Sequence, residues 1–421
     1  MKLYNIFPLL VGKLGEWKPH LVRASDMGFD WIFVNPIQKP GRSGSLYSIA
    51  DYFAINPAFV DQRAEASPEE QMREVAETAR GLGLGMMVDL VINHCAADSA
   101  LAKEHPEWFI TDRKGKITHP FCMRDGQKVV WRDLVQFDYE RSRDREGLFK
   151  YCCDVVDYLV GLGFQGFRCD AAYQIPSQVW KRLIERTKSM HPEVVFAAET
   201  LGCSPEQTKD TAQSGFDYIF NSSKWWDFKS PWLLEQYLLT REFSPSISFP
   251  ESHDTERLFA ESHQNLDAMK QRYLFAALFS TGVMMPIGFE FGFQKNLHVV
   301  KTRPSDWEET GVDLTAFIKQ VNEIKNRHQV FHEESVTDVL ESSNPQVMVM
   351  WKCSHRCKGE ALIILNKDVS NRQIYRTDDL YQHIQARTPL VDVSLEWPMD
   401  YLPTPFEFEL APGMARVLVT E

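Results

Sequence analysis

Short apolar runs alternate with longer amphipathic segments over most of the chain. A short apolar run bounded by turn signals predicts a buried strand, and apolar residues that recur every three to four positions predict a helix packed against it. Eight strands are predicted, at residues 3–11, 31–36, 86–92, 166–170, 194–199, 216–220, 247–249 and 283–287. Their alternation with helices predicts the α/β class, with a closed (β/α)8 TIM barrel as the architecture.

The helix predicted to begin after Ser67 has the clearest boundary signals. Ser67 suits the N-cap, Pro68 suits the first turn, and Glu70 completes a capping box three residues after the serine. Apolar residues at 72, 75, 76 and 79 then share one face, and glycines at 81, 83 and 85 end the helix. Further helices are predicted at residues 17–27, 148–162, 177–189 and 314–328.

The pattern changes beyond about residue 334. Three β-rich runs, at residues 347–351, 361–366 and 414–420, are separated by polar turns and show no helical period. We therefore expect two domains, the barrel over residues 1–333 and a C-terminal antiparallel β-sandwich over residues 334–421. Residues 95–138 lack a strong period and are expected to form an excursion after the third strand of the barrel.

The composition of the chain excludes some classes of function. The 421 residues carry a formal net charge of −12, which argues against nucleic acid as a partner and suits a neutral ligand such as a sugar. The sequence shows no membrane-spanning segment, and the apolar start at residues 6–11 is too short for a signal-peptide core. The eight cysteines form no disulfide framework, so we expect a reduced, cytoplasmic protein. Cys353 and Cys357 form a C-x3-C pair that is more simply a coincidence than a metal site.

Candidate chemistry lies where four of the predicted strands end. One run ends at Asp170, another at Glu199, a third leads to His253 and Asp254, and a fourth carries Asp89, Asn93 and His94. Parallel strands of a barrel place their carboxyl ends on one rim, where barrel enzymes do their chemistry. Side chains alternate along a strand, so Arg168 and Asp170 point the same way and the guanidinium favours the ionised carboxylate. Alone, this pair fits equally well a buried ion pair that joins two elements.

These four runs resemble the conserved motifs of one enzyme family. In chain order they are MMVDLVINH (86–94), GFRCDAA (166–172), VVFAAE (194–199) and SISFPESHD (246–254). Together they are similar to the four motif regions of the α-amylase family of glycoside hydrolases. The resemblance implies a retaining reaction in which Asp170 is the nucleophile, Glu199 is the general acid and base, and Asp254 grips two hydroxyls of the sugar. For such a pair of carboxyl groups, a separation of about 5–5.5 Å is expected.

The resemblance also implies a set of substrate-binding residues. Tyr47 and Asp51 would line the sugar pocket from the segment SGSLYSIADYFAIN (43–56), His94 and His253 would donate hydrogen bonds to the same sugar, and Arg168 would orient Asp170. Asp89 and Asn93 are more often structural residues of the rim in this family, or calcium contacts in some members. The excursion at residues 95–138 corresponds to the family's domain B and is short, so no metal and no cofactor are expected. Trp225, Trp226 and Trp307 are either stacking platforms for further glucose units or packing residues.

A weaker likeness concerns the α-1,4-glucan:maltose-1-phosphate maltosyltransferases of this family. It rests on EHPEWF (104–109), DREGLF (144–149) and TRPSDWEE (302–309). Those transferases hold the donor's phosphate with an asparagine after the nucleophile and with a Lys–Tyr pair. Here Ala171 follows Asp170, and Val130 and Trp131 replace the pair, so Arg124 or Lys128 would have to bind the phosphate.

Three functions therefore remain open. The first is hydrolysis of α-1,4-glucans or transfer between glucans, through a covalent glycosyl-aspartate intermediate. The second is maltosyl transfer from a sugar phosphate. The third is an inactive carbohydrate-binding or scaffold module, which the presence of all three carboxylates disfavours. The expected partner is an oligosaccharide or glucan, with no nucleic acid and no membrane; linkage preference and oligomeric state do not follow from the sequence.

Overall fold

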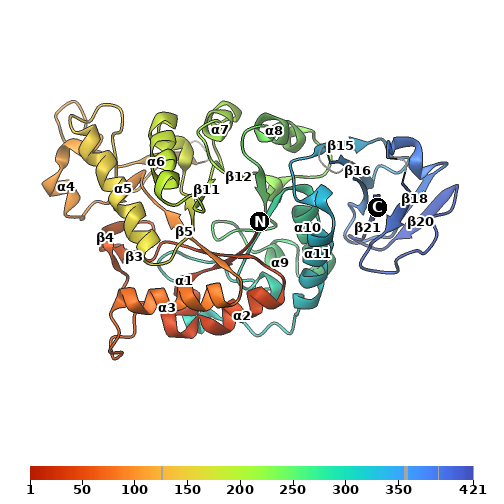
Figure 1. Cartoon of the computed structure of the whole chain (residues 1–421), viewed down its shortest axis with the longest axis horizontal. Coiled ribbons are helices and arrows are strands. Elements are labelled where there is room, and N and C mark those ends of the chain that lie inside the picture. Colours follow the sequence, from red (N-terminus) through yellow and green to blue (C-terminus); the bar gives the residue numbers. More distant parts are fainter. Residues whose placement is uncertain (125–126, 355–358, 387, 421) are drawn as a thin grey trace.

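A computed structural model describes residues 1–124, 127–354, 359–386 and 388–420 of the chain. Its main part is a closed barrel of eight parallel strands in the order β1-β14-β13-β12-β11-β10-β5-β2 (Figure 1). This arrangement confirms the predicted barrel. The barrel strands are β1 (Lys2–Ile6), β2 (Trp31–Val34), β5 (Gly85–Leu90), β10 (Gly166–Cys169), β11 (Val195–Ala198), β12 (Tyr218–Phe220), β13 (Ser246–Ser248) and β14 (Gly282–Pro286).

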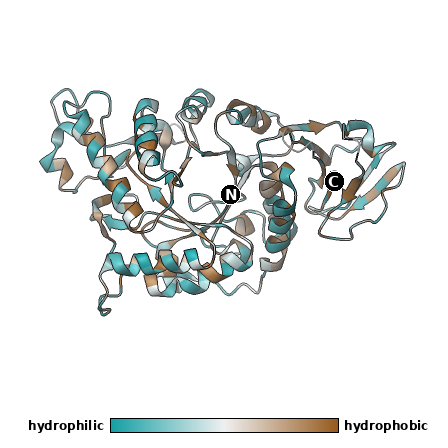
Figure 2. Cartoon of the chain, viewed as in Figure 1, coloured by the Kyte–Doolittle hydropathy of each residue, from teal (hydrophilic) through white to brown (hydrophobic). Residues whose placement is uncertain are grey.

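Helices surround the barrel, and both hydrophilic and hydrophobic residues alternate along them (Figure 2). The capping box predicted for α3 is present, because the Ser67 hydroxyl accepts from the Glu70 backbone N–H and the Glu70 carboxylate accepts from the Ser67 N–H. The helices around the barrel are α1 (Pro8–Val11), α2 (Lys18–Asp26), α3 (Pro68–Gly81), α5 (Arg145–Gly161), α6 (Ser177–Met190), α7 (Pro205–Ala212), α8 (Trp232–Thr240), α9 (Leu258–Glu261), α10 (Leu266–Phe279) and α11 (Thr315–Arg327). No helix among the described residues is long and apolar enough to cross a membrane.

The first strand is shorter than its apolar run. The sequence predicts a strand over residues 3–11, but β1 ends at Ile6 and Pro8 begins the short helix α1. Proline cannot donate a ladder hydrogen bond and fits the first turn of a helix, which explains the break. The sequence also left α7, α8 and α10 unassigned between the later strands. Short 3₁₀ helices complete the barrel part: η1 (Leu14–Glu16), η2 (Pro106–Trp108), η3 (Ala172–Gln174), η4 (Ser223–Trp225), η5 (Phe289–Phe291), η6 (Pro304–Asp306) and η7 (Gln329–Phe331).

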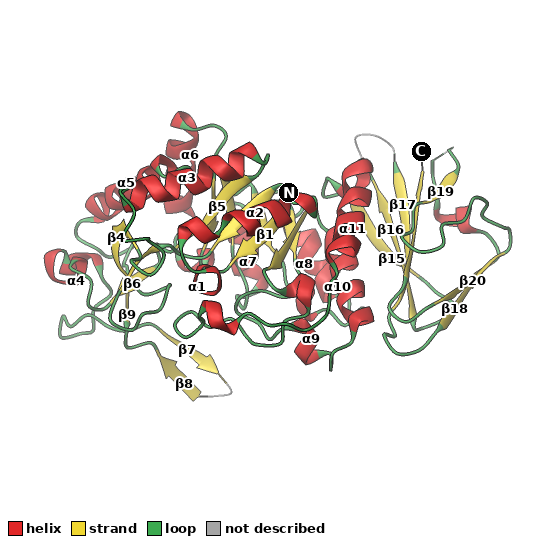
Figure 3. Ribbon diagram, turned by 90° about the horizontal axis from the view of Figure 1, so that it is seen from below, coloured by secondary structure: helices red, strands yellow, loops and turns green. Residues whose placement is uncertain are grey.

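Two segments leave the barrel at the carboxyl ends of its strands. After β2 the chain forms the antiparallel pair β3 (Gln38–Pro40) and β4 (Ile49–Ile55). Between β5 and α5 it forms β6 (His94–Ala96), α4 (Leu101–Glu104), and then β7 (Phe121–Arg124), β8 (Gln127–Val130) and β9 (Leu134–Gln136). Strand β6 pairs with β9, and the hairpin of β7 and β8 projects away from the barrel (Figure 3).

The C-terminal part is an antiparallel β structure, as predicted. Five strands form one sheet in the order β15-β16-β17-β21-β19, and β18 pairs with β20 in a second sheet. In Figure 1 they lie together at one end of the molecule. Their bounds are β15 (Val336–Leu340), β16 (Val347–Cys353), β17 (Glu360–Asn366), β18 (Gln373–Thr377), β19 (Leu390–Asp392), β20 (Phe406–Leu410) and β21 (Ala415–Thr420), with η8 (Leu380–His383) between β18 and β19.

Alternate residues of the five-stranded sheet belong to two different cores. Met348 and Met350 of β16 pack in the same apolar cluster as the barrel helices, whereas Val347 and Val349 pack against β18 and β20. This alternation follows from the two-residue period of a strand. The Lys352 side chain, buried on β16, also donates to a backbone carbonyl of α10. The sheet is therefore buried on both faces, one of them by the barrel.

Candidate active site

Four parallel strands bring the predicted chemical residues to one rim of the barrel. Asp89 lies in β5, Asp170 follows β10, Glu199 follows β11, and His253 and Asp254 lie in the loop after β13. Strand β10 pairs with both β5 and β11, and in the first of these ladders Arg168 is directly opposite Asp89. The barrel order therefore places the carboxyl groups of neighbouring strands around one arginine.

The guanidinium of Arg168 is the centre of this rim. Its Nη1 donates to both oxygens of Asp89, at 2.8 Å each, and to Oδ1 of Asp170 at 3.0 Å. Its Nη2 lies 3.9 Å from Oε2 of Glu199. The arginine is only 4% exposed, so these charges interact with little screening by water. The Arg168–Asp170 pair fits both interpretations given by the sequence. The guanidinium is part of a buried ion pair that joins two strands, and it also contacts the candidate nucleophile.

Glu199 has an environment suited to proton transfer. Its Oε2 accepts from the Ala171 N–H at 2.9 Å, and its Oε1 accepts from the Leu201 N–H at 2.5 Å. Burial raises the pKa of Glu199 to about 7, with a contribution from the Asp170 charge, although Arg168 and the two backbone donors oppose the rise. A carboxyl group with this pKa is present in both protonation states near neutral pH, as a group that must give and then take a proton requires.

Ala171 links the two carboxylates through its backbone. Its φ of 41° lies in the left-handed region, which costs an L-residue other than glycine about 1–2 kcal/mol. The Ala171 N–H donates to Glu199, while the preceding residue, Asp170, accepts from Arg168. Strain of this kind at a site residue is a sign of a local geometry held by its surroundings.

Tyr47 and His253 extend the network toward Asp254. The Tyr47 hydroxyl lies 2.6 Å from Oδ2 of Asp89 and 2.6 Å from Nε2 of His253, and the same Nε2 lies 3.0 Å from Oδ2 of Asp254. The Tyr47 and His253 rings are also stacked, with centroids 5.7 Å apart. Partial desolvation raises the pKa of Asp254, but His253 and Arg168 outweigh it and lower the pKa to about 2. Asp254 is 57% exposed and is therefore an accessible carboxylate.

Asp89, His94 and Asn93 support the rim. Asp89 is fully buried, and desolvation raises its pKa to about 6 against the opposing charge of Arg168. Nε2 of His94 lies 2.9 Å from the Tyr47 carbonyl, and burial lowers the pKa of this histidine. The Asn93 side chain donates to Oε1 of Gln174 at 3.3 Å.

Asp51 is the one predicted pocket residue that the structure does not bring to the others. It lies on β4 with its side chain exposed, and its Oδ1 accepts from the Phe53 N–H at 3.0 Å. No hydrogen bond or ion pair connects it with Tyr47, Arg168 or any of the carboxylates within the described ranges. Its predicted place in the sugar pocket gains no support here.

The tryptophans divide into packing and exposed residues. Trp226 is 2% exposed and packs against Phe275 and Phe279 of α10, so it is a packing residue. Trp307 packs edge-on against Phe293, with ring centroids 5.0 Å apart. Trp225 remains a candidate platform, because it is 51% exposed.

Sequence analysis overlooked three contributors to the rim. Asn35 directly follows β2, is fully buried and donates to the Tyr47 hydroxyl at 3.0 Å. It carries the same signal as the predicted residues, a polar side chain at the end of an apolar run. Tyr173 and Gln174 lie on η3, shortly after Asp170, and line a cavity of about 440 Å³. The described residues that line this cavity include the carboxylates of Asp138, Glu140 and Asp210 and no lysine, arginine or histidine.

One group of side chains in the described part of the chain has the spacing of metal ligands. It consists of His105, Glu107 and Asp144, outside the rim. Asp144 already accepts from the Trp108 indole at 3.0 Å and caps α5 through the Gly147 N–H. These bonds account for its position without a metal. The second cysteine of the C-x3-C pair, Cys357, lies outside the described residues.

Comparison with known proteins gives sequence relatives and fold neighbours. A family model described as "Glycogen debranching enzyme, glucanotransferase domain" matches residues 1–114. An α-1,4-glucan:maltose-1-phosphate maltosyltransferase of Burkholderia pseudomallei is 25% identical over 332 residues, 77% of this chain and 29% of the relative. The enzyme of the same name from Myxococcus xanthus is 25% identical over 407 residues, 90% of this chain and 57% of the relative. The chain therefore spans between about a third and somewhat more than half of these relatives.

Solved structures show the same fold at lower sequence identity. The α-amylase of Geobacillus thermoleovorans, solved with acarbose, superposes with a TM-score of 0.78 at 15% identity and covers 100% of this chain and 98% of that one. A noncanonic maltogenic α-amylase of Thermotoga neapolitana superposes with a TM-score of 0.77 at 19% identity, with the same coverage. At these identities the superpositions establish the fold of the whole chain.

Proposed function

Because the family model, the sequence relatives and the fold support the α-amylase family of glycoside hydrolases, with a resemblance to maltosyltransferases, we propose that the chain is a retaining α-glycosidase or transglycosylase. Its substrates would be α-linked glucose oligosaccharides or glucans. The observation that carries the proposal is the pairing of two unlike carboxyl groups on Arg168. Asp170 accepts from the guanidinium at 3.0 Å, whereas Glu199 lies farther from it and has a pKa raised to about 7.

In the proposed reaction, Asp170 attacks the anomeric carbon as an anion. The ion pair with Arg168 fixes the carboxylate at the end of β10. A covalent glycosyl-aspartate forms, and the bond between the anomeric carbon and the leaving oxygen breaks. Since each of the two displacements inverts the anomeric carbon, the product keeps the α configuration.

Glu199 supplies and recovers the proton in this scheme. It is protonated in part near neutral pH and transfers its proton to the leaving oxygen as that bond breaks. As a carboxylate it then removes a proton from the incoming water or sugar hydroxyl, whose oxygen attacks the anomeric carbon as the bond to Asp170 breaks. The Ala171 and Leu201 N–H donors stabilise this charged form after the first step.

Asp254 and the histidines would hold the sugar. Asp254 is exposed and charged, so it can accept hydrogen bonds from two sugar hydroxyls. Burial keeps His94 neutral near pH 7, and its Nε2 is oriented by the Tyr47 carbonyl. His253 is fixed between Tyr47 and Asp254.

The reaction is hydrolysis if water attacks the glycosyl-aspartate and transfer if a sugar hydroxyl attacks it. The experiment that tests the proposal incubates the protein with maltooligosaccharides and follows the products by chromatography and proton NMR. Shorter sugars or a redistributed ladder are expected, with the new reducing end first formed as the α anomer. A β anomer would contradict the retaining mechanism, and the absence of any change would contradict the function. The Asp170→Ala protein is the matched control for contaminating amylase.

A second candidate is maltosyl transfer from a sugar phosphate, and the names of the sequence relatives favour it. The site around the carboxylates favours a neutral leaving group instead. Ala171 offers no side-chain hydrogen bond, and the Lys128 ammonium lies over the Phe121 ring, 3.9 Å from its centroid. The side chain of Arg124 lies outside the described residues. Phosphorus NMR with added maltose-1-phosphate distinguishes the two, because only the transferase releases phosphate.

The proposal includes a cytoplasmic location. Among the described cysteines, Cys95, Cys152, Cys153 and Cys169 are buried free thiols. Free thiols persist in a reducing compartment.

A further inference from the structure

The loop that carries His253 and Asp254 is closed by a buried ion pair. Glu251 and Arg257 lie at its two ends, six residues apart, and both side chains are 1% exposed. Nη1 of Arg257 donates to Oε1 of Glu251 at 2.7 Å, and Oε2 of Glu251 accepts from the Leu258 N–H at 2.5 Å. The chain between the two residues is therefore a ring, closed by hydrogen bonds at its base.

Arg257 also joins this loop to the segment that follows β14. Its Nη2 donates to the Ile287 carbonyl at 2.9 Å, and its Nε donates to the Lys295 carbonyl at 3.2 Å. Its backbone N–H donates to Oδ1 of Asn296 at 3.2 Å. Because β14 is the barrel strand that pairs with β13, the guanidinium holds the loop against a rigid neighbour.

The segment after β14 also contacts the loop after β2. The Val299 carbonyl accepts from the Leu46 N–H at 3.1 Å, next to Tyr47. The Tyr47 hydroxyl in turn lies 2.6 Å from Nε2 of His253. Residues 295–299 therefore join the loop after β2 to the loop after β13.

Asp254 depends on this loop for its position. Its side chain is 57% exposed, and within the described ranges the one ion pair of its carboxylate is with Nε2 of His253, at 3.0 Å. Its backbone N–H donates to the Ser252 hydroxyl at 3.2 Å, inside the same loop. The carboxylate therefore lies where the path of the loop places it, and Glu251 and Arg257 fix the two ends of that path.

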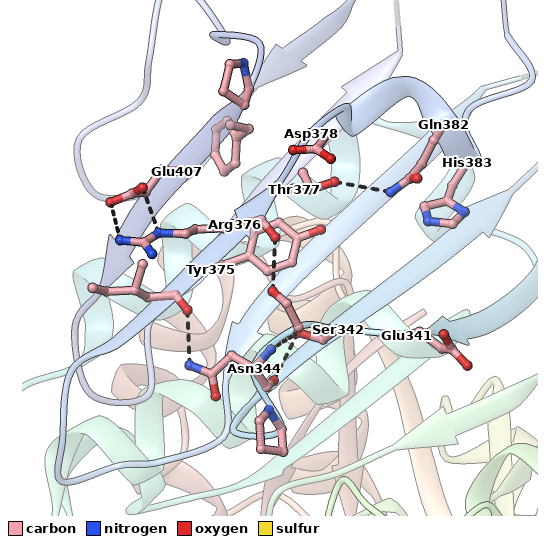
Figure 4. Close-up of a pocket in the computed structure, with 15 residues that line it drawn as sticks. Glu341, Ser342, Asn344, Tyr375, Arg376, Thr377, Asp378, Gln382, His383 and Glu407 are labelled. Atoms are coloured by element: carbon pink, nitrogen blue, oxygen red, sulfur yellow. Dashed lines mark hydrogen bonds and ion pairs between the residues drawn. The ribbon is translucent and has the colours of Figure 1, made fainter.

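Stability alone is a poor reason for burying such a pair. Taking a carboxylate and a guanidinium out of water costs free energy that their attraction often fails to exceed. An exposed pair of the same length avoids this cost in the C-terminal part, where Nε of Arg376 lies 2.7 Å from Glu407 beside a cavity of about 1070 Å³ (Figure 4). We propose that Arg257 is a positioning residue, which acts through the path of this loop to place the Asp254 carboxylate against the sugar. The part of the sugar in this inference rests on the proposed function.

Arg257→Lys tests the inference. Lysine keeps a positive charge beside Glu251, but one ammonium cannot reproduce the planar set of bonds to Glu251 and to the carbonyls of Ile287 and Lys295. The measurement is kcat/KM for α-maltosyl fluoride, because fluoride leaves with little help from an acid. We expect a loss of about tenfold or more, since a displaced substrate-holding group lowers the rate by such factors.

A double-mutant cycle with Asp254→Asn shows whether this loss is caused through Asp254. Two residues that act as one unit give changes that do not add. When Asp254→Asn is already present, Arg257→Lys should therefore lower kcat/KM by less than about twofold. Equal losses in the two backgrounds would overturn the inference, because Arg257 would then act independently of Asp254.

The chain offers a matched control in its C-terminal part. Nη1 of Arg416, on β21, lies 3.0 Å from Asp392, and both side chains are 0% exposed. Arg416→Lys also weakens a buried pair, so it should lower the free energy of unfolding in urea as Arg257→Lys does. It should change kcat/KM by less than about twofold, because this pair lies far from the rim. A tenfold loss in Arg416→Lys would overturn the inference, since lower stability alone would then explain the kinetics.

A second variant covers the case in which Arg257→Lys does not fold. Glu251→Gln/Arg257→Met removes both charges and leaves neither of them buried without a partner. It takes the place of Arg257→Lys in the same cycle, with the same expected losses.

Hydrogen–deuterium exchange of residues 252–258 gives a reading that needs no turnover. These amides should exchange about fivefold or more faster in Arg257→Lys than in the wild type, and Arg416→Lys should leave them unchanged. Faster exchange without any turnover by the wild-type protein would support the hold of Arg257 on the loop while the proposed function fails. Turnover of the wild type with unchanged exchange in Arg257→Lys would leave the function standing and overturn the inference.

Discussion

Replacing Glu199 by glutamine should change how the stability of the protein depends on pH. In the folded protein, burial raises the pKa of this carboxyl from 4.5 to about 7. A raised carboxyl pKa means that the folded state binds the proton more tightly than the unfolded chain does. The stability that Glu199 contributes is therefore fully present below about pH 4.5 and is lost as the pH rises through about 7.

The size of the effect follows from the shift. Each pKa unit corresponds to about 1.4 kcal/mol, so the rise to about 7 corresponds to about 3 kcal/mol of unfolding free energy. Glutamine does not titrate and removes this pH-dependent loss. It also places an amide group against one of the two backbone donors, Ala171 N–H or Leu201 N–H, at a cost of about 1–3 kcal/mol. That cost does not depend on pH, so it leaves unchanged the way in which the difference in unfolding free energy between the two proteins varies with pH.

The assay is urea unfolding of the wild-type and Glu199→Gln proteins between about pH 4.5 and about pH 8.5, followed by tryptophan fluorescence. The unfolding free energy of the variant minus that of the wild type should rise by about 3 kcal/mol across this range. Taking the difference cancels the titrating groups that do not interact with Glu199.

Asp254→Asn is the control for this measurement. The pKa of Asp254 is lowered to about 2, so its contribution is present above its usual range and is lost only as the pH falls toward 2. The corresponding difference should be constant between about pH 5 and about pH 8. A constant difference for Glu199→Gln as well would refute the raised pKa and, with it, the reasoning that Glu199 holds a proton at neutral pH.

Four further predictions concern the same rim. Asp170→Ala should abolish turnover and leave the circular dichroism spectrum unchanged; an active variant would remove Asp170 from the nucleophile role. The wild-type kcat/KM should fall as the pH rises through about 7, where Glu199 loses its proton, and the same fall in the residual activity of Glu199→Gln would contradict this assignment. Arg168→Lys should lower the unfolding free energy by roughly 3 kcal/mol, because it removes bonds to the buried Asp89; a loss below about 1 kcal/mol in urea unfolding would speak against it. Ala171→Gly should raise the melting temperature slightly, since glycine adopts a φ of 41° without the strain of about 1–2 kcal/mol; a lower melting temperature would show that no such strain exists.

The barrel could be predicted from the sequence because each barrel strand is a short apolar run that ends in polar residues. Parallel strands place those ends together, so the sequence alone predicts that Asp170 and Glu199 lie side by side. The helix after Ser67 was equally predictable, because its capping box is local and appears in the structure as expected.

Helix α10 could not be found in the same way. Its residues are buried between the barrel strands and the C-terminal sheet, including Met269, Tyr273, Ala277 and Phe279. A helix buried on several sides lacks the polar stripe from which helical period is recognised. The end of the first strand was missed for a different reason, since one proline interrupts an otherwise uniform apolar run.

The limits of the site prediction lie in its loops. The segment that contains Tyr47 and Asp51 was expected to bring both to the sugar, but β4 turns Asp51 toward solvent. Asn35 was overlooked although it contacts Tyr47 directly. Ala171 adopts a left-handed conformation and donates its N–H to Glu199, and alanine gives no sequence signal for that conformation.

The five-stranded sheet packs one face against the helices of the barrel, and this contact limits how the chain can be shortened or recombined. A C-terminal module joined by a linker can be exchanged or deleted, but removal of this one would expose Tyr237 and Phe279, whose rings lie near the buried Lys352 of β16. A shortened chain would therefore aggregate instead of folding as a smaller enzyme. The C-terminal part is separate from the barrel in the order of its strands, yet it shares a core with the barrel helices, so we expect the two parts to unfold together.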